Sequence, residues 1–108
     1  MIMRVYRCMM IAGKDAEFRE FAFSKSHPWL RQQPGLMGFY AGRQLPDSGS
    51  RARCMVQIWE SADAIRAAIG EDWQAPPALS EEVRRFVESA SVEHYEIADE
   101  FKAEVRPD

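Results

Sequence analysis

The alternation and spacing of apolar residues divide the chain into a regular series of elements. Residues 2–11 are rich in Val, Ile, Met and Tyr, which favours a β-strand, and the sequence Ala-Gly-Lys at 12–14 is a turn signal. The same criteria predict three further strands, over residues 36–45, 53–60 and 91–97.

Helical spacing of apolar residues predicts a helix after the first strand. Phe18, Phe21 and Ala22 fall on one stripe of this helix. Asp15 is the predicted N-cap, because its carboxylate can accept a backbone N–H of the first turn. The helix should extend to about residue 27 or 31, with a break near Ser26 because Pro28 removes a backbone donor.

A second helix is predicted over residues 62–69, with Ser61 as its N-cap, and Ser80 begins a further helical turn. The order of elements is then βαββαβ. It predicts an α+β, ferredoxin-like fold with a four-stranded antiparallel sheet and helices on one face. We expect one domain over residues 1–98 and a charged C-terminal tail over 99–108.

Both faces of the predicted sheet are apolar. In the first strand, side chains alternate so that Met3 and Val5 point to one face while Tyr6, Cys8 and Met10 point to the other. The helices of a 108-residue chain can cover only one of these faces. An exposed apolar sheet face favours aggregation, so a second chain is expected to cover it. The pattern therefore predicts a homodimer that packs sheet on sheet.

Composition excludes several classes of function. The formal net charge is −3 and no basic run occurs, which argues against nucleic-acid binding. No apolar stretch approaches a membrane span or a signal peptide, so a cytoplasmic protein without membrane contact is expected. Cys8 and Cys54 show no metal-ligand spacing and are interpreted as reduced thiols, so no metal is predicted. Motifs of hydrolases, NTPases and nicotinamide enzymes do not occur in the sequence.

Three segments carry a resemblance to a known family: residues 33–39 (QPGLMGF), 58–65 (IWESADAI) and 92–97 (VEHYEI). With the order of elements, they make residues 2–98 similar to the antibiotic biosynthesis monooxygenase domain family. The resemblance implies a dimeric α/β barrel with a cavity between the helices and the sheet of each subunit. In some members the cavity hosts oxidation of quinol or polycyclic aromatic substrates without metal or flavin. Others bind and cleave haem, and others have no established activity.

The absence of asparagine bears on the mechanism that this resemblance implies. The cofactor-free oxygenases and the haem degraders of the family both tend to use an Asn amide near the reacting centre, and this chain contains no Asn. The Asn position of the haem degraders falls near Tyr6 and their helical Trp near Ala68. Haem binding, through His27 or His94, is therefore the disfavoured alternative, and we expect a protein without a cofactor.

His94 and Tyr6 are the predicted catalytic residues. A near-neutral imidazole suits deprotonation of a phenol or hydroquinone, and the Tyr6 hydroxyl could replace the missing amide as a hydrogen-bond partner. Three aromatic residues are predicted to bind a planar substrate: Trp73, Trp59 and Tyr95. Each candidate also has a purely structural interpretation. His94 could be a hydrogen-bonded histidine at the dimer face, and Trp73 could anchor its loop to the core. Tyr6, Trp59 and Tyr95 could serve only in packing.

These observations favour a homodimeric, cofactor-independent monooxygenase-like protein that oxidises a small planar aromatic, such as a quinol or a polyketide-like phenol. Four arginines lie in the predicted strands: Arg4 and Arg7, on opposite faces of the first strand, and Arg43 and Arg53, which could face one another across a hairpin. Any of them that reaches the cavity could stabilise a developing phenolate or superoxide, and surface or interface ion pairs with Glu93 or Glu96 are the alternative role. A non-catalytic small-molecule-binding or structural dimer of the same fold is the alternative function. An open cavity favours the enzyme, and a cavity filled by side chains favours the alternative.

Overall fold

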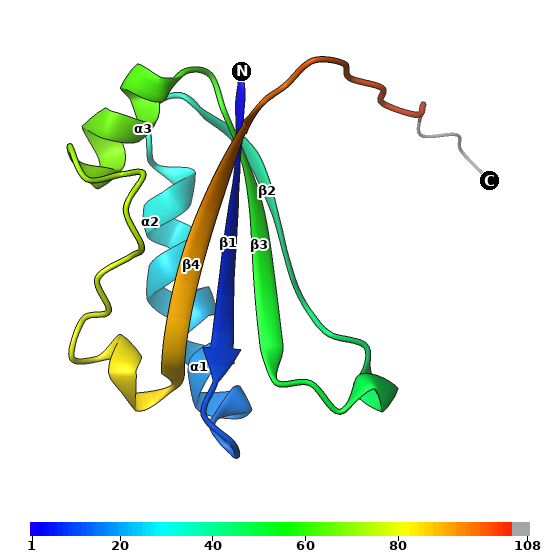
Figure 1. Ribbon diagram of the computed structural model, residues 1–108, viewed down its shortest axis with the longest axis vertical. Coiled ribbons are helices and arrows are strands. Elements are labelled where there is room, and N and C mark those ends of the chain that lie inside the picture. The colour runs from blue at the N-terminus through cyan, green and yellow to red at the C-terminus, as the bar shows by residue number, and fades with distance from the viewer. Residues whose placement is uncertain (105–108) are drawn as a thin grey trace.

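The computed structural model describes residues 1–104 and contains one antiparallel sheet of four strands (Figure 1). The strand order is β2-β3-β1-β4, so the first and third strands are central. The strands are β1 Ile2–Met10, β2 Leu36–Arg43, β3 Ala52–Trp59 and β4 Val87–Glu96. The predicted α+β, ferredoxin-like fold is confirmed.

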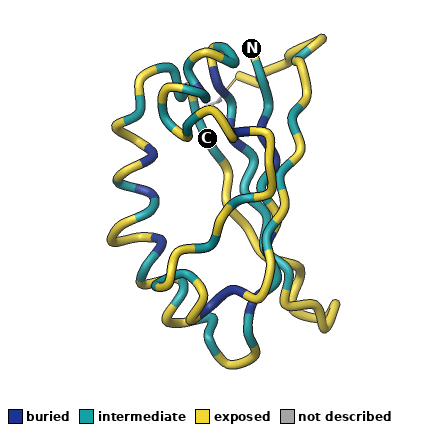
Figure 2. Tube along the Cα trace, turned by 60° about the vertical axis from the view of Figure 1, so that its left-hand side comes forward, coloured by how far each residue is buried: buried dark blue, intermediate teal, exposed yellow. Residues whose placement is uncertain are grey.

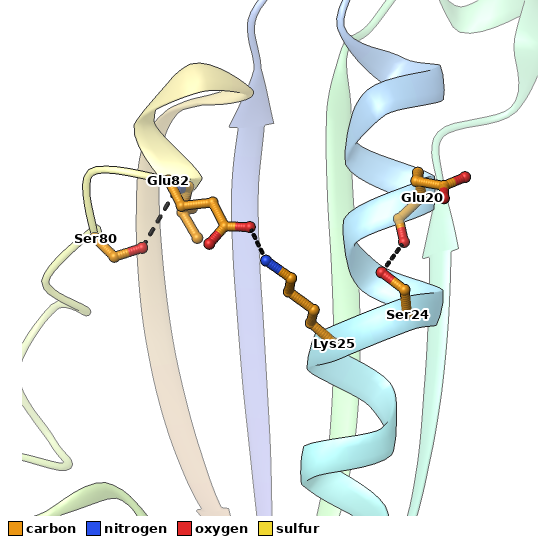
Figure 3. Close-up of polar contacts among 6 residues, drawn as sticks. Glu20, Ser24, Lys25, Ser80 and Glu82 are labelled. Atoms are coloured by element: carbon orange, nitrogen blue, oxygen red, sulfur yellow. Dashed lines mark hydrogen bonds and ion pairs between the residues drawn. The ribbon is translucent and has the colours of Figure 1, made fainter.

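One face of the sheet is covered by a continuous helical segment that follows β1 (Figure 1). It comprises α1 Asp15–Phe21, the π-helical turn η1 Ala22–Ser26 and α2 His27–Arg31. The expected irregularity before Pro28 thus takes the form of a π-helical turn. Ser24 lies within this turn, and its hydroxyl donates a hydrogen bond to the carbonyl oxygen of Glu20 at 2.7 Å (Figure 3).

Of the N-caps predicted for the two helices, Asp15 is wrong and Ser61 is confirmed. Lys14, not Asp15, is the N-cap of α1, and no side chain caps that end. The Asp15 carboxylate is drawn away because it pairs with Arg53 of β3. In contrast, the Ser61 hydroxyl accepts the backbone N–H of Ala64 at 3.1 Å and caps α3, Ala62–Ile69, as predicted.

The last strand begins earlier than the sequence pattern indicates. A helical turn does follow Ser80, whose hydroxyl accepts the backbone N–H of Val83 at 3.2 Å. This turn leads into the 3-10 helix η3 Val83–Arg85, whose N-cap is Glu82, but β4 already starts at Val87. Val87 pairs with Met10 of β1 beyond a β-bulge, and both side chains are buried in the core. Residues 88–91 give no strand signal in the sequence, because they are polar or small and no large apolar residue alternates with them.

Two buried clusters stabilise the layer between the helices and the sheet, and Figure 2 shows the buried positions of the long helical segment on its sheet-facing side. The first contains Cys8, Met10, Phe86 and Val87. The second contains Leu30, Trp59, Ile65 and Trp73. The first cluster joins the end of β1 to the start of β4 and to the Phe18 and Phe21 rings of α1. The second joins the end of β3 to α2 and α3.

The other face of the sheet carries no helix of this chain (Figure 1). The register aligns Tyr40, Val56 and Val5 across three strands on this face. Tyr40 is 81% exposed, and Met3 and Ile58 lie side by side on the same face. The apolar character that strand alternation predicted for both faces is thus present in the structure.

Gly35, in the turn before β2, is required by both its backbone conformation and its surroundings. Its φ is +85°, and a Cβ built there would lie 2.5 Å from the Cβ of Ala64 in α3. We expect Gly35→Ala to lower the free energy of unfolding by about 1–3 kcal/mol, measured by urea denaturation. The double variant with Ala64→Gly should lose less than the sum of the single losses, because the clash is removed. Strict additivity would contradict this explanation.

The predicted charged tail begins beyond β4. Residues 97–104 form no helix or strand, and Phe101 is 89% exposed. The remainder of the predicted tail, residues 105–108, lies outside the described residues. Within residues 1–104, every helix is too short or too polar to cross a lipid bilayer.

Candidate functional site

A cavity of about 570 Å³ lies between the sheet and the helical segment. This is where the family resemblance places a ligand cavity. β1 contributes Arg4, Tyr6 and Cys8 to its lining, and β3 contributes Arg53, Met55 and Gln57. The helical segment contributes Phe18, Phe21, Ala22, His27 and Leu30, and residues 77–80 form part of the wall.

The walls of this cavity are mainly aromatic and aliphatic. Phe18 and Phe21 pack against Phe86, with ring centroids 6.3 Å and 5.8 Å apart. An ion pair of 2.7 Å between Lys25 and Glu82 joins the helical segment to the turn before β4 (Figure 3). An apolar cavity with a few polar groups is typical of sites that bind small organic molecules.

Arg4 is the most unusual polar group of the cavity. Its side chain lies on the helix-covered face of β1, and the residue is only 4% exposed. Its Nη1 donates hydrogen bonds of 2.7 Å to the carbonyl oxygen of Trp73 and to Nε2 of His94. Among residues 1–104, no carboxylate forms an ion pair with it. A buried charge without a counter-charge is costly, and burial accordingly lowers the pKa of Arg4.

His94 holds Arg4 in position. A guanidinium can only donate hydrogen bonds, so Nε2 of His94 is the acceptor and its Nδ1 carries the proton. Burial, and then the charge of Arg4, lower the pKa of His94, which keeps the ring neutral. Its ring also packs edge-on against Trp73 at 4.7 Å. These contacts support a positioning role, and the assignment of His94 as the base stays a prediction.

Tyr6 lies two residues from Arg4 on the same face of β1 and lines the cavity. Burial, with a smaller contribution from the Cys8 thiol, raises the pKa of Tyr6 to about 12. Its hydroxyl is therefore protonated at neutral pH. No hydrogen-bond partner occupies this hydroxyl within the described part of the chain, so it can donate to a ligand.

His27 faces the cavity from α2. Its ring lies 5.3 Å from that of Phe23 and 5.1 Å from that of Phe39, and burial lowers the pKa of His27. Phe39 of β2 pairs with Gln57 of β3, and Gln57 pairs with Arg4 of β1. The strand beneath His27 is therefore two strand spacings, about 10 Å in total, from the strand that carries Arg4.

His94 and the three predicted aromatic residues lie outside the cavity lining. Trp59 is fully buried and donates a 2.9 Å hydrogen bond from Nε1 to Oε1 of Gln57, which does line the cavity. Trp73 belongs to the same core cluster, where it anchors its loop through the Arg4 contact. Tyr95 points to the uncovered sheet face, where its hydroxyl donates to Glu93. The structure thus brings Arg4, His94 and Trp73 together and separates Tyr95 from them.

Sequence reasoning missed some residues that line the cavity. Gln57 gives no signal in the sequence, because its role depends on its neighbours in the sheet. Phe18 and Phe21 were assigned to the core on helical spacing, which cannot separate a filled core from an open cavity.

The fold and the helix-covered cavity define a ferredoxin-like α+β protein with an internal cavity. No family model matches the sequence, and no curated protein matches it. Solved structures do share its fold. SnoaB, a cofactor-independent oxygenase from Streptomyces nogalater, has a TM-score of 0.69 at 18% identity, covering 94% of this chain and 97% of that chain.

Two further structures show the range of proteins with this fold. One is the heme-degrader MhuD from Mycobacterium tuberculosis, with two hemes bound, which has a TM-score of 0.68 at 21% identity. The match covers 94% of this chain and 100% of the MhuD chain. A protein from Bacteroides thetaiotaomicron, provisionally described as an antibiotic biosynthesis monooxygenase, has a TM-score of 0.69 at 13% identity, with 95% of each chain covered. The predicted resemblance to antibiotic biosynthesis monooxygenase domains is thus confirmed at the level of the fold.

Proposed function

We propose that this protein is a cofactor-independent oxygenase that binds a planar phenol as its phenolate. The observation that carries the proposal is Arg4, a buried guanidinium that faces an apolar cavity without a carboxylate partner in the described residues. A phenolate oxygen supplies the missing negative charge. The fold shared with a cofactor-independent oxygenase supports the same chemistry.

Arg4 and Tyr6 together form the proposed oxyanion site. Charge-assisted donation from the guanidinium and a neutral hydroxyl both favour the ionised form of the phenol. His94 and the Trp73 carbonyl hold Arg4 in place, so little reorganisation is needed when the charge develops. His27 replaces His94 as the proposed proton acceptor, because its imidazole lines the cavity and burial lowers its pKa, whereas Nε2 of His94 is engaged by Arg4.

The resulting anion is electron-rich enough to reduce molecular oxygen. One electron passes to O₂ to give a radical pair, and recombination at carbon gives a peroxide that loses water. For anthrone the balance is C₁₄H₁₀O + O₂ → C₁₄H₈O₂ + H₂O, with anthraquinone as product. The substrate supplies all the electrons, so no added reductant is required.

Oxygen uptake with anthrone and a panel of hydroquinones tests this proposal. We expect protein-dependent uptake of one O₂ per anthrone and incorporation of one atom of ¹⁸O₂ into the quinone. Anaerobic incubation should give binding without product. Oxidation at the same rate with and without the protein would contradict the proposal and favour a non-catalytic binding protein.

We further propose that the functional unit is a homodimer formed through the uncovered sheet face. The apolar centre of this face supports the proposal, because Val56 and Ile58 are only partly buried on a central strand that has no covering layer on this side, and Tyr40 beside Val56 is exposed. Arg7 and Glu93 form an ion pair beside them. Burial of such a surface between two sheets would remove a large apolar area from water.

Haem is the second candidate ligand, and His27 is the observation that favours it. The MhuD structure shows that this fold can hold haem. Here the residues fit the group in part: the His27 imidazole borders an apolar cavity and could provide a nitrogen ligand, whereas His94 is engaged by Arg4. Haem would supply redox chemistry at iron. A haem titration showing a Soret shift that is lost in His27→Ala would favour this function over the phenol oxygenase.

A further inference from the structure

A second positively charged group lies at the other end of the cavity from Arg4. Arg53 of β3, Arg43 of β2 and Arg19 of α1 all line the cavity there. They surround one carboxylate, Asp15: Arg53 Nη2 lies 2.5 Å from Asp15 Oδ1, and Arg43 Nη1 lies 3.6 Å from Asp15 Oδ2. The hydrogen bond from Arg53, and then the charges of Arg53, Arg43 and Arg19, lower the pKa of Asp15.

The charges in this cluster do not balance. Three guanidinium groups face one carboxylate, which leaves an excess of two positive charges. Arg53 directs its Nε and Nη2 to a single oxygen of Asp15, so its Nη1 remains available. The side chain of Arg43 is 58% exposed and makes only the longer contact. Both arginines therefore retain donors for a further anion.

Arg53 is held at the edge of the aromatic wall. Its side chain is only 15% exposed, and its guanidinium lies 5.0 Å from the centroid of the Phe18 ring. Arg43 and Arg53 are paired in register on neighbouring strands, so the two side chains emerge side by side on the cavity face. Paired guanidinium groups suit a carboxylate, because their planar donors match its two oxygens.

The spacing of the two charged ends indicates the length of the ligand. Arg53 pairs with Cys8, which follows Arg4 by four residues on the same face of β1. Four residues of a strand span about 13 Å. The Phe18 and Phe21 rings form the apolar wall between these ends.

We propose that Arg43 and Arg53 form a carboxylate subsite, and that the substrate is an elongated planar aromatic with an ionisable hydroxyl at one end and a carboxylate at the other. This inference rests on the proposed function, because the hydroxyl end is placed at Arg4. The carboxylate joins Asp15 as a second anion in the arginine cluster and fixes the direction in which the substrate enters the cavity.

Anaerobic binding of matched ligands tests the subsite. The first pair is 2-naphthol and 6-hydroxy-2-naphthoic acid, and a hydroxyanthracene with and without a carboxyl group gives a longer pair. In calorimetric titrations we expect at least one acid to bind about tenfold more tightly than its neutral parent. Arg43→Met and Arg53→Met should each remove most of this gain, measured for every variant as the ratio of the affinities for the acid and for its neutral parent.

Arg66→Met is the matched control, because Arg66 is a paired arginine of α3 that does not line the cavity. Thermal unfolding of each variant separates loss of the subsite from loss of the fold, and exposed Arg43 is the substitution least able to affect folding. Equal affinities for the acids and their neutral parents would overturn the carboxylate subsite but not the proposed function. The same holds if the tighter binding of the acids persists in both Arg43→Met and Arg53→Met. Absence of binding by the acids and by the parents would overturn the proposed function as well.

Discussion

Arg4→Met should lower kcat/KM for anthrone oxidation by about 100-fold or more, since loss of one donor to a developing oxyanion commonly costs this much. Methionine preserves much of the side-chain volume but provides neither the charge nor the donors that contact Trp73 and His94. The loss should fall mainly on kcat, because the guanidinium stabilises the ionised form more than the neutral phenol. Oxygen-electrode kinetics on the folded variant measure both parameters.

Two further variants measure the separate contributions of the positive charge at Arg4 and of the Tyr6 hydroxyl. Arg4→Lys retains a positive charge and should keep more activity than Arg4→Met, although it cannot reproduce both contacts of the guanidinium. Tyr6→Phe keeps the ring and removes only the hydroxyl, so we expect a loss of about tenfold. A folded Arg4→Met protein with wild-type kcat/KM would show that the buried guanidinium has only a structural role.

Val56→Lys should convert the protein from a dimer to a monomer. Val56 lies between Val5 and Tyr40 at the centre of the uncovered face, so a lysine there would place a charge without a partner in the middle of the proposed interface. Burial of an unpaired charge costs several kcal/mol, which corresponds to an affinity between the subunits weakened by about 100-fold or more. Sedimentation velocity over a range of concentrations measures the change.

Leu45→Lys is the control for this substitution. Leu45 lies in the loop between β2 and β3 and is 74% exposed, so it adds the same charge away from the sheet face. The control should remain dimeric. A monomeric wild-type protein, or a Val56→Lys protein as dimeric as the control, would show that the sheet face is not the interface.

The sequence was sufficient for the fold because local signals agree with the tertiary arrangement. Strand alternation in β1 correctly separated Val5 from Tyr6 and Cys8, and Ser61 was recognised as an N-cap from its place before an apolar helical repeat. Asp15 was misassigned because a long-range partner, Arg53, competes with the backbone for its carboxylate. Such competition has no local signature in the sequence.

The candidate site was only partly predictable, because its central contacts join distant parts of the chain. Arg4 and His94 are 90 positions apart, and their hydrogen bond depends on the pairing of β1 with β4. One signal was available for Tyr95: adjacent residues of a strand point to opposite faces, so His94 and Tyr95 could not both face one cavity. Cavity volume had no signal, since the phenylalanines of a filled core and of an open cavity share the same spacing.

The pKa of a bound phenol tests the oxyanion site most directly. Absorbance spectra of 2-naphthol, recorded anaerobically over a range of pH with saturating protein, report the fraction ionised in the cavity. A guanidinium beside the oxygen should lower the pKa of the bound naphthol by about one unit or more relative to the free compound, and Arg4→Met should abolish this shift. A bound naphthol whose pKa is unchanged or raised would contradict the assignment of Arg4 as the phenolate partner.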